Sequence, residues 1–345
     1  MIEIHSCPSA LSEGFDTYSP SAARKLFDGK KVSPILDFGI DGFRRREDII
    51  RAVNRISVSG AQEKFPSIIR GGKICLAAEG ERATHILKPA PWDETISTRK
   101  QIPANENLTM QIASQVYGIR TAANGLCFSP SGEVIYITKR FDLRGDGSRI
   151  GQEDFASLTG RDETSGGVNY KYDGCYADIA EAIRRYIPAW PVAMEEFFRI
   201  VTFNYIYGNG DAHLKNFSIV KSGEDYLLSP AYDLLNTAIH IDGDDFALSG
   251  GLSPALEKSD IYEKTGHPCR EDFESFGRLI GLNERRIATV LNPFTTLPQG
   301  ATRLMRNSFL NEKMKRAYLR TVKTRIQRFC RVNGASKNNL GTIGV

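Results

Sequence analysis

Paired cysteines are absent from this sequence, and their absence excludes several kinds of site. No two cysteines form a Cys-x-x-Cys pair, so neither a zinc site nor a redox motif has support. We expect free thiols and therefore a reducing compartment. The six cysteines are scattered along the chain: Cys7, Cys75, Cys127, Cys175, Cys269 and Cys330.

Long apolar runs are also absent, and neither sign of charge dominates. No apolar run approaches about 18 residues, so we expect no membrane-spanning helix. The start, MIEIHSCPSALSEG, lacks the apolar core of a signal peptide, and we expect a cytoplasmic protein. The net charge of +4 over 345 residues fits the binding of an anion such as a nucleotide. It does not by itself argue for nucleic acid.

The order of the predicted elements indicates an α+β fold with two lobes. Residues 51–140 contain strand-like runs, including a hairpin at Gly71-Gly72, and one amphipathic helix that ends at Gly118. Residues 141–345 are mainly helical. Residues 1–50 form an N-terminal segment of the first lobe, with helices predicted up to Gly29 and over 46–55. We therefore expect a β-rich nucleotide-binding lobe followed by a helical catalytic lobe.

The segment Asn209-Gly210-Asp211-Ala212-His213-Leu214-Lys215-Asn216 carries the strongest chemical signal. Asp211 is followed five residues later by Asn216. Phosphoryl transfer needs a carboxylate beside the attacking hydroxyl and an oxygen ligand for a metal ion, and this spacing provides both. The alternative is an ordinary surface turn, since Asn, Gly and Asp favour turns.

A second carboxylate, Asp233, follows Asp211 by 22 residues. The intervening FSIVKSGEDYLLSPA has the pattern of a strand, a turn and a strand, so a hairpin would return Asp233 to Asn216. Both side chains offer the hard oxygen ligands that suit Mg²⁺. The alternative is that Asp233 caps a following helix.

Two weaker signals come from the first lobe. The small-residue turn over Ser57–Lys64 could cradle phosphates with its backbone N–H groups, although it has one glycine and fits an ordinary β-turn equally well. Lys88 ends a predicted strand, where it could reach phosphates, and Glu106 in the next helix could pair with it. A strand-end lysine is more often solvated, but the order of these parts along the chain is that of a kinase.

Two further features have plainer explanations. His213 lies inside the Asp211 loop, and we favour a structural or phosphate-contacting role over a general base. The basic helix near 309–332 could bind nucleic acid, but we favour a core helix with a solvated basic face. Its apolar positions are Leu310, Met314, Tyr318, Val322, Ile326 and Phe329.

Seven segments between about residues 51 and 250 resemble, in order, the blocks of the HipA-like kinases, the toxins of bacterial toxin–antitoxin systems. These segments are VSGAQEKF, THILKP, ANENLTMQIA, ITKRFD, QEDFASLTG, NGDAHLKNFSIV and SPAYDLL. The resemblance implies a protein Ser/Thr kinase fold that uses ATP and Mg²⁺.

The resemblance also implies roles for particular residues. Asp211 corresponds to the catalytic aspartate, Asn216 and Asp233 to the metal ligands. Ser57 and Ser59 correspond to loop serines of the kind that these kinases autophosphorylate. The nucleotide-binding positions that it implies are Ser59, Gly60, Ala61, Gln62, Glu63, Lys64, Lys88, Lys139, Arg140, Phe141, His213, Lys215, Asn216, Tyr232 and Asp233.

The chain departs from the longer members of this family in one respect. Its phosphate loop begins near residue 57, so an N-terminal subdomain that helps those members to bind an antitoxin is not expected. This resembles the short HipT-type branch, in which a separate small protein supplies that part. Some short relatives begin with a Cys-rich knuckle, but only Cys7 lies in this region, so we expect no zinc.

The leading hypothesis is a toxin kinase that phosphorylates a protein Ser or Thr, with an aminoacyl-tRNA synthetase as the expected target. Its partners would be an antitoxin and, only indirectly through that antitoxin, DNA. A small-molecule kinase on the same scaffold and a catalytically silent binding module are the alternatives. A panel of phosphate acceptors separates the first two, and an ATP-turnover assay tests the third.

Overall fold

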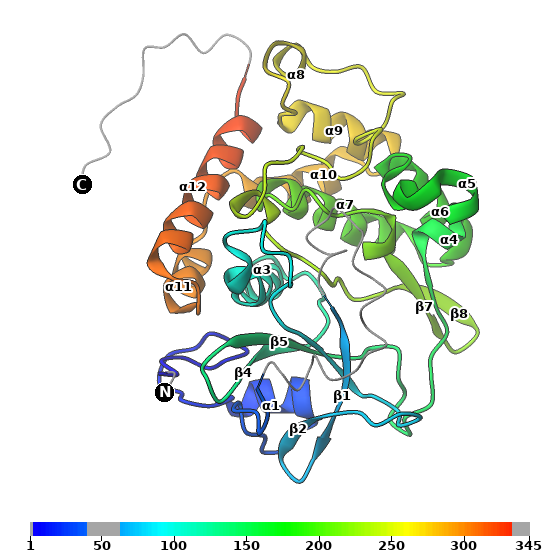
Figure 1. Ribbon diagram of the computed structural model, residues 1–345. Coiled ribbons are helices and arrows are strands. Elements are labelled where there is room, and N and C mark those ends of the chain that lie inside the picture. Colours follow the sequence, from blue (N-terminus) through cyan, green and yellow to red (C-terminus); the bar gives the residue numbers. More distant parts are fainter. Residues whose placement is uncertain (1–2, 40–62, 333–345) are drawn as a thin grey trace.

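The computed structural model describes residues 3–39 and 63–332. A five-stranded sheet fills the lower part of Figure 1 and helices fill the upper part, with α3 (Ile102–Tyr117) between them. This arrangement confirms the expected two-lobed α+β fold. The helix predicted over 46–55 lies outside the described residues, and the lobe boundaries at 50 and 140 stay predictions.

The sheet of the first lobe is antiparallel throughout, in the order β2-β1-β3-β5-β4. Gly71 and Gly72 both have positive φ (57° and 74°), which a tight hairpin turn requires and which glycine adopts without strain. The predicted hairpin is therefore confirmed. The strands are β1 (Phe65–Arg70), β2 (Lys73–Leu76), β3 (His85–Lys88), β4 (Asn124–Phe128) and β5 (Val134–Lys139).

Helix α3 is buried on almost all sides because it lies between the lobes. Its apolar residues Leu108 and Ile112 are buried as the spacing predicts, and Gly118 ends it in a left-handed conformation (φ 63°). Its polar residues Asn105, Glu106, Asn107, Thr109 and Gln111 are buried as well. The predicted helix and its end at Gly118 are therefore confirmed, and the structure adds that its polar face is buried as well.

The buried side chain of Asn105 ties α3 to the second lobe. Its Nδ2 donates to the carbonyl oxygen of Asn236 at 2.8 Å and to Nε2 of His240, also at 2.8 Å. Because an amide nitrogen can only donate, Nε2 is unprotonated, and Nδ1 carries the proton that faces Thr98 Oγ1 at 2.7 Å. Burial lowers the pKa of His240 to about 4, so the ring is neutral at pH 7.

The second lobe packs its helices around α7 (Trp190–Ile206), whose side chains from Phe197 to Ile206 are nearly all buried. The other long helices are α6 (Tyr176–Tyr186), α9 (Arg270–Leu279), α10 (Glu284–Leu291), α11 (Gln299–Asn307) and α12 (Glu312–Phe329). The short elements are α4 (Phe155–Leu158), α5 (Glu163–Gly166), α8 (Asp260–Thr265) and the 3₁₀ turns η2 (Arg99–Gln101), η3 (Gly167–Tyr172), η4 (Leu214–Asn216), η5 (Thr237–Ile239) and η6 (Asn292–Phe294).

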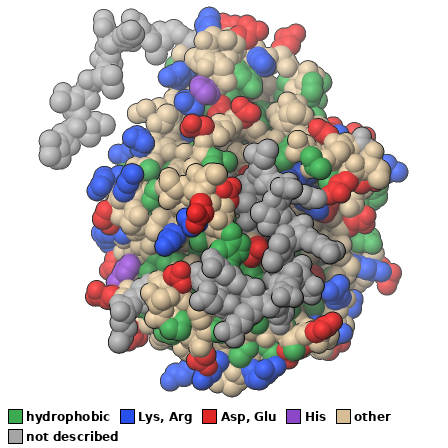
Figure 2. Space-filling view, viewed as in Figure 1, with side chains coloured by type: hydrophobic (Ala, Val, Ile, Leu, Met, Phe, Trp, Pro, Cys, Tyr) green, Lys and Arg blue, Asp and Glu red, His purple; other side chains and the backbone are tan. Residues whose placement is uncertain are grey.

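Helix α12 buries its predicted apolar series and points most of its basic side chains outward. Figure 2 shows Lys and Arg gathered along the left edge of the view, where α12 lies in Figure 1. Arg325 is the exception, because it is 6% exposed, pairs with Asp245 at 2.6 Å and lies over the Tyr205 ring. The prediction of a wholly solvated basic face was wrong at this position.

A second, smaller sheet contains the predicted hairpin, whose second strand leads the chain back to the lobe boundary. Its order is β6 (Gln152–Asp154), β7 (Ser218–Ser222) and β8 (Asp225–Leu228), and the β7–β8 hairpin is confirmed. After β8 the chain pairs in parallel with the first lobe, where Ala231 N donates to Arg120 O at 2.7 Å. Ala122 N donates to Ala231 O at 2.9 Å, and this bridge fixes the backbone just before Asp233.

The beginning of the chain packs against α11, near the other end. Ser6 Oγ donates to the carbonyl oxygen of Asn307 at 2.8 Å, and Asn307 Nδ2 donates to Leu11 O at 3.1 Å. Helix α1 (Pro20–Phe27) follows, capped by Ser19, and ends before Gly29 as predicted. Its Leu26 and Phe27 are buried under the five-stranded sheet.

Candidate active site

The loop that carries Asp211 is held by side-chain hydrogen bonds to its backbone. Asn209 Oδ1 accepts from Asp211 N at 3.2 Å, while Asn209 Nδ2 donates to Asn204 Oδ1 on α7 at 3.0 Å. Gly210 N donates to Thr237 Oγ1 at 2.8 Å. Because the loop is anchored on both sides, the carboxylate of Asp211 is positioned by the fold, and the alternative of a loose surface turn is wrong.

Asp233 adopts a left-handed backbone conformation, with φ of 55°. Such a conformation is uncommon for residues other than glycine and often marks a functional site, although aspartate tolerates it better than most. Its Oδ2 lies 3.4 Å from Asn216 Nδ2. The hairpin therefore brings Asp233 to Asn216 as the sequence predicts, and Asp233 does not cap a helix.

Lys88 is a buried residue at the lobe boundary. It is 4% exposed, and its Nζ donates to Glu106 Oε1 at 2.6 Å and to Asp233 Oδ1. The predicted Lys88–Glu106 pair is therefore present, and the alternative of a solvated lysine is wrong. Burial alone lowers the pKa of Lys88, but the carboxylates of Asp233 and Glu106 outweigh it and hold that pKa above its usual range.

Two lysines neutralise Asp233. Besides Lys88, Lys64 places its Nζ 3.3 Å from Asp233 Oδ2. Burial raises the pKa of this carboxyl, but the two ammonium groups reverse the effect and hold its pKa well below its usual range. Asp233 is therefore ionised at neutral pH.

Of the predicted phosphate loop, the structure describes only Glu63 and Lys64. Lys64 faces the site, while Glu63 accepts a hydrogen bond from the Trp92 indole N–H. The earlier positions, Ser57, Ser59, Gly60, Ala61 and Gln62, lie outside the described residues, so their roles stay predictions.

Of the predicted nucleotide-binding positions Lys139, Arg140, Phe141 and Tyr232, the structure brings some together and not others. The Phe141 and Tyr232 rings lie 5.6 Å apart, and Tyr232 Oη donates to Lys215 O at 2.8 Å. Lys139 Nζ pairs with Asp28 at 2.5 Å, and Arg140 forms a two-point contact with Asp142. The Lys139 side chain is therefore engaged elsewhere, while Arg140 is bound to Asp142, which lines a cavity next to Tyr232.

A cavity of about 660 Å³ adjoins the Tyr232 ring. Tyr232 and Lys215 line one part of it, and Lys215 Nζ also donates to Tyr170 Oη at 3.2 Å. The remaining lining residues are Asp142, Arg149, Ile150, Gly151, Gln152 and Asp154. Tyr232, the residue before Asp233, lines this cavity, and its size suits the base and sugar of a nucleotide.

His213 is buried and neutral, and the predicted structural or phosphate-contacting role stays a prediction. Burial lowers its pKa to about 4. Its ring meets that of Tyr172 edge-on, with centroids 5.2 Å apart. Tyr172 also donates to Asp211 Oδ1 at 2.7 Å. The sequence analysis missed Tyr172, because nothing in its local sequence signals a contact with a residue 39 positions away.

The oxygen ligands fit Mg²⁺ bound together with a nucleotide. Asp233 offers a carboxylate, and Asn216 Oδ1, which accepts from His213 N at 3.1 Å, retains a second lone pair. Over residues 3–39 and 63–332 no three or more His, Cys, Asp or Glu side chains form a group that could hold a metal alone. Mg²⁺ is commonly bound by one or two protein oxygens together with phosphate oxygens, and Asp233 and Asn216 fit this coordination.

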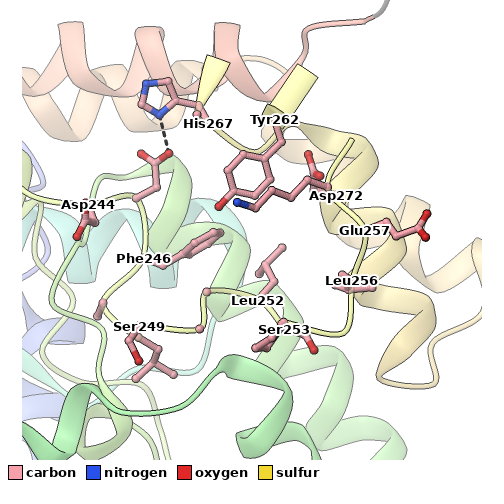
Figure 3. Close-up of a pocket in the computed structure, with 18 of the residues that line it drawn as sticks. Asp244, Phe246, Ser249, Leu252, Ser253, Leu256, Glu257, Tyr262, His267 and Asp272 are labelled. Atoms are coloured by element: carbon pink, nitrogen blue, oxygen red, sulfur yellow. Dashed lines mark hydrogen bonds and ion pairs between the residues drawn. The ribbon is translucent and has the colours of Figure 1, made fainter. Parts of the chain in front are cut away.

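A cavity of about 740 Å³ lies away from these groups, between the segment 243–258 and helices α8 and α9. Figure 3 shows Phe246 and Leu252 on its floor, Tyr262 pointing into it, and His267 bonded to a carboxylate at its edge. That carboxylate is Asp245, which accepts from His267 Nδ1 at 2.7 Å and also pairs with Arg325. The cavity contains none of the predicted site residues, so we do not assign the nucleotide to it.

Comparison with known proteins identifies the family. Residues 56–300 match the family described as the HipA-like C-terminal domain. The chain belongs to this HipA-like family. A Sinorhizobium fredii protein named "Putative kinase Y4mE" is 31% identical over 203 residues, which are 54% of this chain and 44% of that protein. A Haemophilus influenzae protein named "Putative kinase" is 27% identical over 304 residues, 83% of this chain and 84% of that protein.

Solved structures agree on the fold of the HipA-like chain. The Shewanella oneidensis HipA toxin, solved with HipB and its operator DNA, superimposes with a TM-score of 0.64 at 19% identity, over 84% of this chain and 70% of that one. The chain spans less than half the length of the Sinorhizobium relative. In the described part of the HipA-like chain, no helix is both long and apolar enough to span a bilayer.

Proposed function

We propose that this chain is an ATP- and Mg²⁺-dependent serine/threonine protein kinase, the toxin of a toxin–antitoxin system. The observation that carries the proposal is that Lys64, Lys88, Glu106, Asp211 and Asp233 converge on one small pocket of about 10 Å³. A buried lysine–glutamate pair, an ionised metal-binding aspartate and a second, anchored aspartate are the parts that kinases use. The kinase names of its relatives support the same conclusion.

Each group has a distinct task in the proposed reaction. The acceptor oxygen attacks the γ-phosphorus, the bond to the β,γ-bridging oxygen breaks, and ADP leaves. Asp211 orients the acceptor hydroxyl and takes its proton. Asp233 would exchange its lysine partners for Mg²⁺, which supplies charge neutralisation at the phosphates. Lys88, still held by Glu106, would then donate to the phosphates.

The partners belong to the proposal as well. The family resemblance suggests an aminoacyl-tRNA synthetase as the protein substrate, an antitoxin as inhibitor, and contact with DNA only through that antitoxin. The Shewanella toxin, whose structure contains HipB and operator DNA, supports such a partnership. Phosphoproteomics after brief expression in a host cell identifies the substrate, and a panel of small-molecule acceptors tests the protein specificity.

The central test compares Asp211→Ala and Asp233→Asn with the wild-type chain. We expect both variants to lose MgATP turnover and toxicity on expression while they stay folded. Asn is preferred at position 233 because it also tolerates the left-handed backbone. Asp225→Ala, an exposed change at the β7–β8 turn, is the matched control. Near-wild-type turnover in either active-site variant would contradict the proposal.

Autophosphorylation of Ser57, Ser59 or both is a further part of the proposal. A phosphoserine adds roughly 1.5 to 2 negative charges, which would repel the triphosphate and weaken ATP binding. Mass spectrometry should find phosphate at these positions in the active chain and none in Asp211→Ala. Phosphate in both proteins would indicate another kinase, and phosphate in neither would leave the serines as small residues in a turn.

A further inference from the structure

Tyr172, at the end of η3, reaches the carboxylate of Asp211 from outside the Asp211–Asn216 loop. Its Oη donates to Asp211 Oδ1 at 2.7 Å. A tyrosine hydroxyl is neutral at pH 7, so the contact is a donor placed on one oxygen of an anionic acceptor, and such bonds are stronger than neutral ones.

The tyrosine is itself held in place on several sides. Its ring meets His213 edge-on at 5.2 Å, and Lys171 Nζ lies 4.9 Å from the ring centroid. Its carbonyl oxygen accepts from Ser249 N at 2.9 Å, and Gly250 N donates to Gly174 O at 2.8 Å. The segment after Asp233 thus clamps the backbone of η3, so the hydroxyl approaches Asp211 from a fixed direction.

A second tyrosine nearby provides a useful contrast. Tyr176 Oη donates to the backbone carbonyl of Ala212 at 2.9 Å and is 2% exposed. That bond holds the loop backbone but touches no side chain of the site. Tyr172 is partly exposed, and its bond ends on the carboxylate itself. The Tyr176 hydroxyl therefore supports the loop backbone, whereas the Tyr172 hydroxyl orients the carboxylate.

We propose that Tyr172 is a positioning residue for phosphoryl transfer. By engaging Oδ1 it fixes the rotation of the Asp211 carboxylate, so that Oδ2 faces the acceptor hydroxyl and receives its proton. The tyrosine keeps its own proton throughout and makes no bond to phosphorus. The inference rests on the proposed kinase function, and it assigns to η3 a part in the chemistry that no local motif indicates.

The effect expected from Tyr172 is on the rate and not on nucleotide binding. Without this donor the carboxylate is held less firmly and spends less time in the productive geometry, and misplacement of about 1 Å can cost roughly 10²-fold in rate. In the proposed function Asp233, Lys88 and Asn216 would hold the metal and phosphates without Tyr172. Loss of the hydroxyl should therefore lower the turnover rate while leaving the affinity for MgATP unchanged.

The test compares Tyr172→Phe with wild type and with the control Tyr226→Phe, which removes a hydroxyl from the exposed face of β8. We expect the rate of MgATP turnover to fall at least about 10-fold. The dissociation constant for a non-hydrolysable ATP analogue should stay within about twofold, and the melting temperature should not change. A rate within about threefold of wild type, a faster rate, or a parallel loss of affinity would overturn the assignment.

Chemical rescue gives a second, independent measurement. In Tyr172→Ala the missing side chain leaves space that phenol can fill, and phenol restores a donor whereas toluene restores only the ring. Rescue by phenol alone supports the positioning role, and equal rescue by both compounds or by neither overturns it. Asp211→Ala is measured in parallel. If it turns over MgATP as fast as wild type, the proposed kinase function itself fails, while an impaired Asp211→Ala with unaffected Tyr172 variants refutes only the role of Tyr172.

Discussion

Replacing Lys88 by methionine should destabilise the protein as well as inactivate it. The substitution keeps much of the volume but removes the ammonium group that neutralises Glu106, which is 2% exposed. Removing one partner of a buried ion pair costs roughly 3–5 kcal/mol, because the remaining charge stays buried without compensation. Asp233 keeps Lys64 as a partner, so the loss of stability should come mainly from Glu106.

The measurement is urea denaturation at pH 7.5, with MgATP turnover recorded on the same preparations. Unfolding free energy should fall by about 3–5 kcal/mol in Lys88→Met and by less than about 0.5 kcal/mol in Lys25→Met, an exposed control on α1. Turnover should fall by roughly 10² to 10³, since a fixed cation at the phosphates is lost.

The double variant Lys88→Met/Glu106→Gln separates the two effects. Neutral glutamine removes the uncompensated charge, so at least about 2 kcal/mol of stability should return while turnover stays low. A loss below about 1 kcal/mol in the single variant, or a double variant no more stable than the single one, would refute the electrostatic reasoning. Normal turnover in Lys88→Met would show that the lysine serves the fold alone.

Three further changes test other parts of the structure. Burial lowers the pKa of His240 to about 4, so between about pH 6.5 and 4 the unfolded chain binds a proton that the folded chain does not. The unfolding free energy should therefore fall as the pH is lowered through this range. His240→Gln should reduce the difference in unfolding free energy between pH 7 and pH 4 by about 3 kcal/mol. Arg325→Met removes a buried partner of Asp245 and should cost roughly 3 kcal/mol by urea denaturation, with a loss below about 1 kcal/mol counting against the pair. Gly277→Ala places a Cβ 2.8 Å from Ile287 Cγ1 and should cost about 1–3 kcal/mol, whereas Gly145→Ala meets open space and should be neutral in a thermal melt.

The sequence predicted which candidate residues lie together where the spacing is local. Asp211 and Asn216 belong to one loop, and the hairpin pattern between Asn216 and Asp233 was enough to expect that the chain returns. The Lys88–Glu106 pair was expected from the order of a strand and a helix. In each case regular secondary structure connects the residues, so periodicity carries the necessary information.

The rest depended on contacts between distant segments. Tyr172 and Arg325 lie in stretches whose local patterns match an irregular loop and a solvated basic face, and only packing turns them toward Asp211 and Asp245. The burial of Asn105 on α3 likewise follows from its place between the lobes, where tertiary structure overrides the helical pattern. The local sequence around a residue does not show which distant segment will pack against it.

The contact between the first residues and α11 has a consequence for how the chain is made. Ser6 and Leu11 complete their hydrogen bonds only with Asn307, about 300 residues later. At roughly 5–20 residues per second, the ribosome needs on the order of 15–60 s to supply that partner. During this interval the N-terminal segment lacks part of its native packing. Contacts between residues far apart in the sequence slow folding, so we expect this segment to dock late. We also expect chaperones to bind the chain during synthesis.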